Sequence, residues 1–158
     1  MALMDAKEYD PRPAQRRWRL IIAAVVLLIV VLGLWWFFRY WPEEHAVNKF
    51  FEALERKDFE TAYALYVADP DWKQHPDKYK DYGFNQFKLD WGPSGDYGPI
   101  TAHSVDCSTE LKRKDSSASG VIVVVNVNHR SEPTSLWVEK KNKAITVSPW
   151  QALCHAPR

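Results

Sequence analysis

The nineteen residues from Leu20 to Phe38 include no charge, no amide and no hydroxyl group. As an α-helix, at about 1.5 Å per residue, this run is roughly 28 Å long, which is close to the thickness of the hydrocarbon core of a bilayer. A helix satisfies its own backbone hydrogen bonds, so it can cross lipid without leaving polar groups unpaired. The sequence therefore predicts one transmembrane helix over residues 20–38.

The residues that flank this run predict its orientation. Aromatic side chains, which prefer the membrane–water interface, lie at both ends: Trp18 on one side, and Trp35, Trp36, Tyr40 and Trp41 on the other. Arg16, Arg17 and Arg19 precede the run, whereas Arg39, Glu43 and Glu44 follow it. Because Lys and Arg beside a span favour the cytoplasmic side, we expect a single-pass protein of the cytoplasmic (inner) membrane. Its N-terminus should be cytoplasmic and its C-terminal domain extracytoplasmic, in the periplasm where there is one.

Two other interpretations of the run are weaker. A buried helix of a soluble protein rarely extends this far without a polar face. A cleaved signal peptide has an apolar core of roughly 7–15 residues and small residues before the cleavage site, but residues 35–38 here are all Trp or Phe. We therefore interpret the run as an uncleaved signal anchor. It is preceded by a disordered cytoplasmic tail over residues 1–19 that contains Pro11 and Pro13.

The composition of the remainder suits one small folded domain over residues 42–158. Hydrophobic residues make up 46% of the chain, yet its mean hydropathy is -0.40, because the most apolar residues are concentrated in the predicted span. Residues 40–158 carry fifteen Lys and Arg against seventeen Asp and Glu. No large basic surface follows from this balance, so nucleic acid is not expected as a partner.

Residues 42–95 show helical patterns. Pro42 suits the first turn of a helix, and Glu43 and Glu44 suit its positive end. Apolar residues at helical spacing follow: Ala46, Val47, Phe50, Phe51 and Leu54. Asp58 can cap a second helix, whose apolar face is Phe59, Ala62, Tyr63 and Tyr66. A third helix is predicted from near Pro76, presenting Tyr79, Tyr82, Phe87 and Trp91 and ending at the turn residues 92–95, although Gly83 weakens it.

Beyond residue 97 the pattern is that of strands. They are predicted over residues 100–109, 120–130, 135–140 and 144–149, with a polar loop at 112–119. In the second of them Val121, Val123, Val125, Val127 and His129 share one face, while Ile122, Val124, Asn126, Asn128 and Arg130 share the other. Short connections favour an antiparallel sheet. The predicted fold class is α+β, with a transmembrane helix followed by two or three helices packed on a curved antiparallel sheet.

The run Phe-Phe-x-Ala-Leu-x-x-Lys-Asp-Phe-x-x-Ala-Tyr, from Phe50 to Tyr63, followed by such a sheet, resembles the nuclear transport factor 2-like superfamily, also called the cystatin-like α+β cone. The resemblance covers about residues 43–150. Within the superfamily, the chain is similar to small membrane-anchored, exported members of unknown function. It implies a cone-shaped domain with a pocket between helices and sheet. The superfamily includes isomerases, dehydratases, transport adaptors and secretion subunits, so the fold leaves the function open.

The two cysteines, Cys107 and Cys154, both follow the predicted span. In an extracytoplasmic compartment they can form a disulfide that ties the first long strand to the C-terminal segment. The alternative is two unpaired thiols, with Cys107 buried. The five histidines have no pair at ligand spacing, so neither a metal nor a cofactor is expected.

Candidate site residues fall into three groups. Proton-transfer chemistry in a cone pocket would draw on Asp90, His103, Asp106 and His129, although no catalytic motif is present and no catalytic residue is assigned. A ligand pocket would be lined by Trp91, Tyr63, Tyr66, Tyr82, His103 and His129. A docking surface would use Asn126, Asn128 and Arg130. For the domain's own Trp residues the alternative is core packing, and for the polar strand face it is simple solvation.

These observations favour a non-catalytic interaction or ligand-binding module held at the membrane, with a protein partner or a second copy of itself bound to it. One alternative is a small-molecule-binding protein or enzyme, similar to an isomerase or dehydratase, that uses the cone pocket. Another is a secretion or envelope assembly subunit. A third is an envelope protein that senses redox conditions through Cys107 and Cys154.

Overall fold

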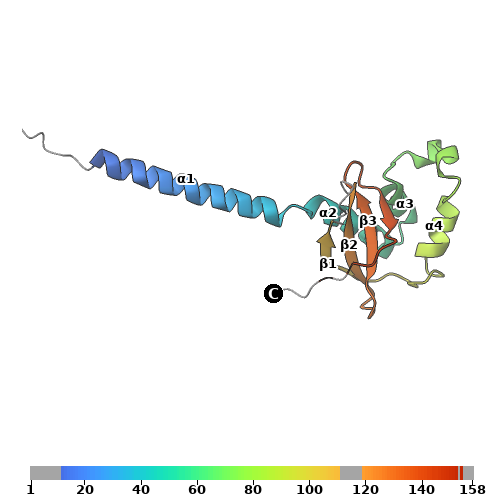
Figure 1. Cartoon of the computed structure of the whole chain (residues 1–158). Helices are drawn as coiled ribbons and strands as arrows, with labels where there is room; N and C mark the ends of the chain where they lie inside the picture. The colour runs from blue at the N-terminus through green and yellow to red at the C-terminus, as the bar shows by residue number, and fades with distance from the viewer. Residues whose placement is uncertain (1–11, 111–118, 153, 155–158) are drawn as a thin grey trace, which may run out of the picture. The chain divides into compact units, whose positions relative to one another are not determined.

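The computed structural model describes residues 12–110, 119–152 and 154 and divides the chain into two compact units, Met1–Arg39 and Tyr40–Arg158 (Figure 1). The first unit holds one helix, α1. The second holds the helices α2, α3 and α4, two short 3₁₀ turns, η1 and η2, and the strands β1–β4. The second unit is an α+β domain with helices first and strands after them, as the sequence predicts.

Helix α1 (Arg12–Phe37) is long and apolar enough to cross a membrane, and every described side chain of residues 17–37 in it is exposed. It begins before the predicted span, so residues 12–19 are helical rather than part of a disordered tail. The reason is local. Arg, Ala and Gln favour helix, and Pro13 lies in the first turn, where its missing N–H costs nothing. Residues 1–11 lie outside the described residues.

Helices α2 (Trp41–Glu55) and α3 (Phe59–Val67) form the predicted helical pair. Pro42 lies in the first turn of α2, followed by Glu43 and Glu44. The side chain of Asp58 caps α3 by accepting a 3.1 Å hydrogen bond from the backbone N–H of Thr61. Helix α3 ends at Ala68, which adopts a left-handed φ of 53°.

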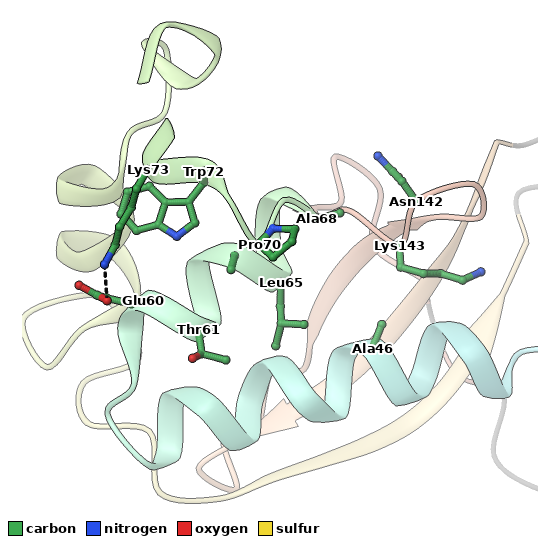
Figure 2. A pocket seen from close by; sticks show the side chains of 11 residues that line it. Ala46, Glu60, Thr61, Leu65, Ala68, Pro70, Trp72, Lys73, Asn142 and Lys143 are labelled. Carbon is green, nitrogen blue, oxygen red and sulfur yellow. Dashed lines mark hydrogen bonds and ion pairs between the residues drawn. The ribbon is translucent and has the colours of Figure 1, made fainter. Parts of the chain in front are cut away.

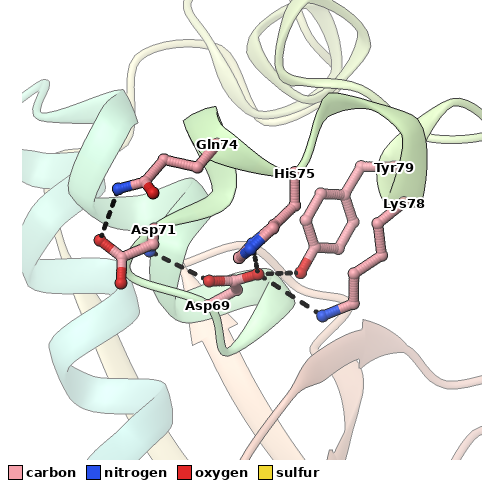
Figure 3. A network of polar contacts seen from close by, with 6 residues as sticks. All are labelled: Asp69, Asp71, Gln74, His75, Lys78 and Tyr79. Carbon is pink, nitrogen blue, oxygen red and sulfur yellow. Dashed lines mark hydrogen bonds and ion pairs between the residues drawn. The ribbon is translucent and has the colours of Figure 1, made fainter.

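The predicted third helix is not continuous. Residues 72–79 form two 3₁₀ turns, η1 (Trp72–Gln74) and η2 (Pro76–Tyr79), and α4 spans only Phe84–Trp91. Gly83 is extended, with ψ of 168°, and is the N-cap of α4. Asp69, which is buried, accepts hydrogen bonds from the Asp71 N–H and the Tyr79 hydroxyl, and these contacts hold residues 71–79 in the path of the two 3₁₀ turns rather than in one α-helix (Figure 3).

The four strands form an antiparallel meander in the order β1-β2-β3-β4. They are β1 (His103–Thr109), β2 (Gly120–Val127), β3 (Thr134–Glu139) and β4 (Ile145–Val147); β1, β2 and β4 are shorter than predicted, and β3 has the predicted length but begins one residue earlier. The pairing of β1 with β2 shifts between Val105 and Cys107, which places a bulge at Asp106. Of the predicted loop at 112–119, only Ser119 is among the described residues.

One face of the sheet packs under the helices. Val121, Val123, Val125 and Val127 belong to a single buried cluster with Phe50, Phe51, Tyr63, Phe87 and Trp91. The predicted alternation is therefore confirmed as far as Val127. His129 does not continue it, because it lies past the end of β2 in a turn where Asn128 and His129 have φ of 52° and 55°. Its side chain is exposed.

Two residues on the other face of the sheet are also apolar and buried. Ile122 and Val124 are only 0% and 1% exposed, although they point away from the helical core. Cys107 on this face is joined to Cys154 with a Cα–Cα distance of 5.8 Å. The predicted disulfide is thus confirmed, and it fastens the C-terminal segment to β1.

Candidate functional site

The structure does not bring the six residues of the expected ligand pocket around one cavity. Tyr63 and Trp91 are buried in the core at 0% and 3% exposure. The Tyr63 hydroxyl donates a 2.7 Å hydrogen bond to the carbonyl of Tyr82, and the Trp91 ring lies 5.1 Å from that of Phe50. The ring of Tyr66 lies 5.5 Å from that of Tyr82 and 6.4 Å from that of Trp91. These aromatic rings fill the space in which the cone pocket was expected.

His103 links β1 to α2. Its Nδ1 lies 2.7 Å from Oε1 of Glu55, and its Nε2 lies 3.2 Å from Oδ1 of Asn48. Its ring also stacks on Phe51 at 5.2 Å, and its side chain is only 12% exposed. A packed imidazole with both nitrogens already facing protein oxygens is placed for stability rather than for proton transfer to a ligand.

The other proton-transfer candidates lie apart from His103. Asp90 accepts hydrogen bonds from the Tyr82 hydroxyl at 2.9 Å and from Gln86 at 2.8 Å. That carboxylate and the burial of the phenol raise the pKa of Tyr82. Asp106 is exposed at the bulge of β1, and His129 is exposed beyond β2. No two of these groups form a catalytic pair in the described residues.

The three residues of the expected docking surface have structural contacts instead. The Asn128 side chain accepts from the backbone N–H of Thr101 at 2.9 Å and donates to the carbonyls of Tyr97 and Pro99. Arg130 donates to the carbonyl of Asp96 at 2.6 Å, and its guanidinium lies over the Tyr97 ring. Asn126 donates to the carbonyl of Arg130. Together they fasten residues 96–102 to the turn after β2, which the alternating pattern alone could not reveal.

A groove of about 570 Å³ lies between α2, α3 and the turn that joins β3 to β4 (Figure 2). Its apolar lining is made of small residues and one large ring: Ala46, Ala64, Leu65, Ala68, Pro70 and Trp72. The groove exists because alanines lie where longer side chains would fill it. Ala64 lies on α3, and Ala68 is the residue at its C-terminal cap.

The charged groups of the groove lie at its two ends (Figure 2). At one end Lys73 pairs with Glu60 at 2.6 Å, beside the Trp72 ring. At the other, Lys143 and Asn142 come from the β3–β4 turn, and Lys143 pairs at 2.5 Å with the buried carboxylate of Glu43. The middle of the groove is left to apolar contact. An elongated ligand with an apolar stripe and polar ends matches this arrangement.

A second polar arrangement surrounds Asp69, which is 9% exposed (Figure 3). Its Oδ2 accepts from the Tyr79 hydroxyl at 2.7 Å and lies 3.0 Å from His75 Nδ1 and 3.5 Å from Lys78 Nζ. Its Oδ1 accepts from the backbone N–H of Asp71. These contacts, first of all the one from Tyr79, lower the pKa of Asp69 to about 2. The network fixes the backbone path of residues 70–79, and Trp72 in this segment lines the groove.

The lowered pKa of Asp69 predicts an acid-dependent loss of stability. The group stabilises the fold fully above its unfolded value of 3.8, and this contribution disappears as the pH falls through about 2. We expect Asp69→Asn to lower the melting temperature at pH 7 by several degrees and to flatten the pH dependence between 4 and 2, as followed by tryptophan fluorescence. Asp81→Asn, an exposed control in the same segment, should change neither. A variant with the parent's acid profile would contradict this role of Asp69.

Among residues 12–110, 119–152 and 154, no group of three or more His, Cys, Asp or Glu side chains is positioned to hold a metal ion. The groove itself was missed by sequence reasoning. In the sequence, its small residues fit the pattern of amphipathic helices and do not indicate a groove. Its other end is formed by residues distant in the chain, since Lys143 lies 100 residues from Glu43, which it contacts. The available signal was the alanine pair on α3 beside a Lys-rich turn.

The chain matches no family model, no curated protein and no solved structure.

Proposed function

We propose that this chain is a single-pass membrane protein whose C-terminal domain lies outside the cytoplasm and binds a protein partner without catalysis. Three observations support this. The exposed apolar α1 suits lipid on all sides, the disulfide suits an oxidising compartment, and the groove supplies a surface for a partner. A narrower form of the same proposal is that the domain has the fold of the nuclear transport factor 2-like superfamily, which its sequence resembles, and acts as an envelope assembly subunit.

The observation that carries the proposal is the alanine-lined groove. Its occupant is an amphipathic helix from a neighbouring protein of the envelope. Small residues let a partner helix come close to α3. An apolar stripe would then lie on Ala46, Ala64 and Leu65, and the polar ends of the helix would meet the Lys73–Glu60 pair and Asn142.

Site-specific photocrosslinking in intact cells tests this proposal. A photoreactive phenylalanine analogue at Thr61, which lines the groove, should give one discrete adduct with a foreign protein. The same analogue at Glu52, which is exposed outside the groove, should give none. Ala64→Trp should reduce the Thr61 adduct at least about tenfold, equivalent to a loss of roughly 1.4 kcal/mol in affinity. The matched variant Glu52→Trp adds the same ring elsewhere and should leave the adduct intact.

Three results would count against the proposal. They are equal labelling from Thr61 and Glu52, an adduct that survives Ala64→Trp, and an adduct between two copies of this chain. A melting curve of each variant separates a filled groove from a damaged fold, since only the latter lowers the melting temperature of the purified protein.

A further inference from the structure

The two faces of the sheet are covered in different ways. Val121, Val123 and Val125 pack under the helices as part of the main core. Ile122 and Val124 face the opposite side and belong to no such cluster, yet both are buried. On that side the described residues of the C-terminal segment, 148–152 and Cys154, contact β1 and β3.

The strand register gives the path of this segment. Cys107, Val124 and Ser135 are cross-strand neighbours on β1, β2 and β3. The backbone N–H of Ala152 donates to Oγ of Ser135 at 3.3 Å, and Cys154 is bonded to Cys107. The segment therefore contacts β3 at Ala152 and β1 at Cys154, the two strands that flank Val124.

The next row of the sheet is covered in the same manner. Ile122 pairs with Trp137 on β3. The ring of Trp150 lies 6.2 Å from that of Trp137, although Trp150 itself is 47% exposed. The C-terminal segment thus lies over the two rows that contain the buried residues of the second face.

The C-terminal segment is held to the sheet mainly by the Cys107–Cys154 disulfide. Among the described residues of this segment, the other contacts with the sheet include the bond from Ala152, the 2.9 Å bond from the Ser148 N–H to the Ser135 carbonyl, and one ring contact. None of its residues belongs to the core cluster, whose last member is Ile145. The segment can therefore leave the sheet without removing any residue from the core.

We propose that the C-terminal segment, described at residues 148–152 and Cys154, forms a cover released by reduction. Attack by one thiolate of an external dithiol on Sγ of Cys154 forms a mixed disulfide and frees Cys107 as a thiolate. The second thiol of the reductant then displaces Cys154, so the reductant leaves as its cyclic disulfide and both cysteines are reduced. The freed segment uncovers Ile122, Val124 and Trp137, while the helices and the strands stay folded. This device goes beyond the proposed partner binding and makes no use of the groove.

Hydrogen–deuterium exchange of the full chain in lipid nanodiscs, with and without dithiothreitol, tests the proposal. Reduction should speed exchange in the C-terminal peptide containing Ser148 and Ala152 at least about tenfold, equivalent to roughly 1.4 kcal/mol of local stability. Amides of Val121–Val127 should remain far slower than those of the C-terminal peptide, because they exchange only through unfolding of the whole domain. The variant Cys107→Ser/Cys154→Ser should show fast exchange of the C-terminal peptide from the start and no response to dithiothreitol. Alkylation of both thiols, read by mass, confirms that the bridge was opened.

Two outcomes would overturn the proposal. If the C-terminal peptide stays protected when both thiols are alkylated, non-covalent contacts alone hold the segment in place. If the amides of β2 come to exchange as fast as those of that peptide, reduction unfolds the domain rather than releasing a cover. Neither outcome bears on the groove, whose crosslinking test is made on the oxidised protein.

Discussion

Replacing Cys107 and Cys154 together by Ser is expected to lower the melting temperature of the domain by roughly 15 °C. The two residues are separated by 47 positions. Closing a loop of that size removes conformational entropy from the unfolded chain, and by the loop-entropy relation this is worth about 4 kcal/mol. Since small domains are stable by about 5–15 kcal/mol in total, the variant should still fold at room temperature with a much smaller margin.

Intrinsic tryptophan fluorescence during thermal unfolding in detergent measures this shift. Ser104→Ala, an exposed substitution on the same strand as Cys107, is the control and should melt like the parent. Adding a reductant to the parent should reproduce the melting temperature of the double variant, and adding it to the variant should change nothing. An unchanged melting temperature in the double variant would mean that the bridge contributes nothing to global stability.

Placing two arginines in the middle of α1, as Ile29→Arg/Val30→Arg, is expected to abolish its insertion into the membrane. Each Arg at the centre of a span costs roughly 2.5–3.5 kcal/mol, whereas each Ile or Val contributes only about 0.3–0.6 kcal/mol in favour. The pair therefore cancels most of the gain from the apolar run. Without export, the domain remains in a reducing compartment, so Cys107 and Cys154 should both be found as free thiols.

Membrane fractionation measures whether the protein is inserted, and alkylation of thiols before lysis measures whether Cys107 and Cys154 are free. The conservative pair Ile29→Leu/Val30→Leu keeps the apolar run and should behave like the parent, with the protein in the membrane fraction and its cysteines protected. If the arginine variant still fractionates with membranes and still holds its disulfide, α1 is not the element that anchors and exports the domain.

Much of the domain could be predicted from local patterns in the sequence. The cap at Asp58, the helices before the strands and the alternation of Val121, Val123 and Val125 all follow from residues close together in the chain. The pairing of Cys107 with Cys154 could be predicted because the chain has two cysteines and both follow the predicted span. Helix α1 extends further toward the N-terminus than predicted. The charged residues before Leu20 do not end the helix, because Arg is a good helix former.

The features that the sequence could not reveal depend on contacts between distant residues. Asn128 looked like a solvated strand residue, but it bonds to residues 97–102 through a turn that only the fold creates. Trp91 and Tyr63 suggested a ligand pocket, but packing against Phe50 and Phe87 makes them core. The groove needs α3 beside the β3–β4 turn, and no periodicity encodes that juxtaposition.

The location of the C-terminal domain outside the cytoplasm is the central claim, and reporter fusions after Arg158 test it most directly. Alkaline phosphatase becomes active only where its own disulfides form, whereas a green fluorescent protein placed at the same position folds in the cytoplasm. The three arginines at residues 16–19 and the Cys107–Cys154 bond predict an active phosphatase and a dark fluorescent fusion. A fluorescent fusion with an inactive phosphatase would place the domain in the cytoplasm and contradict the account.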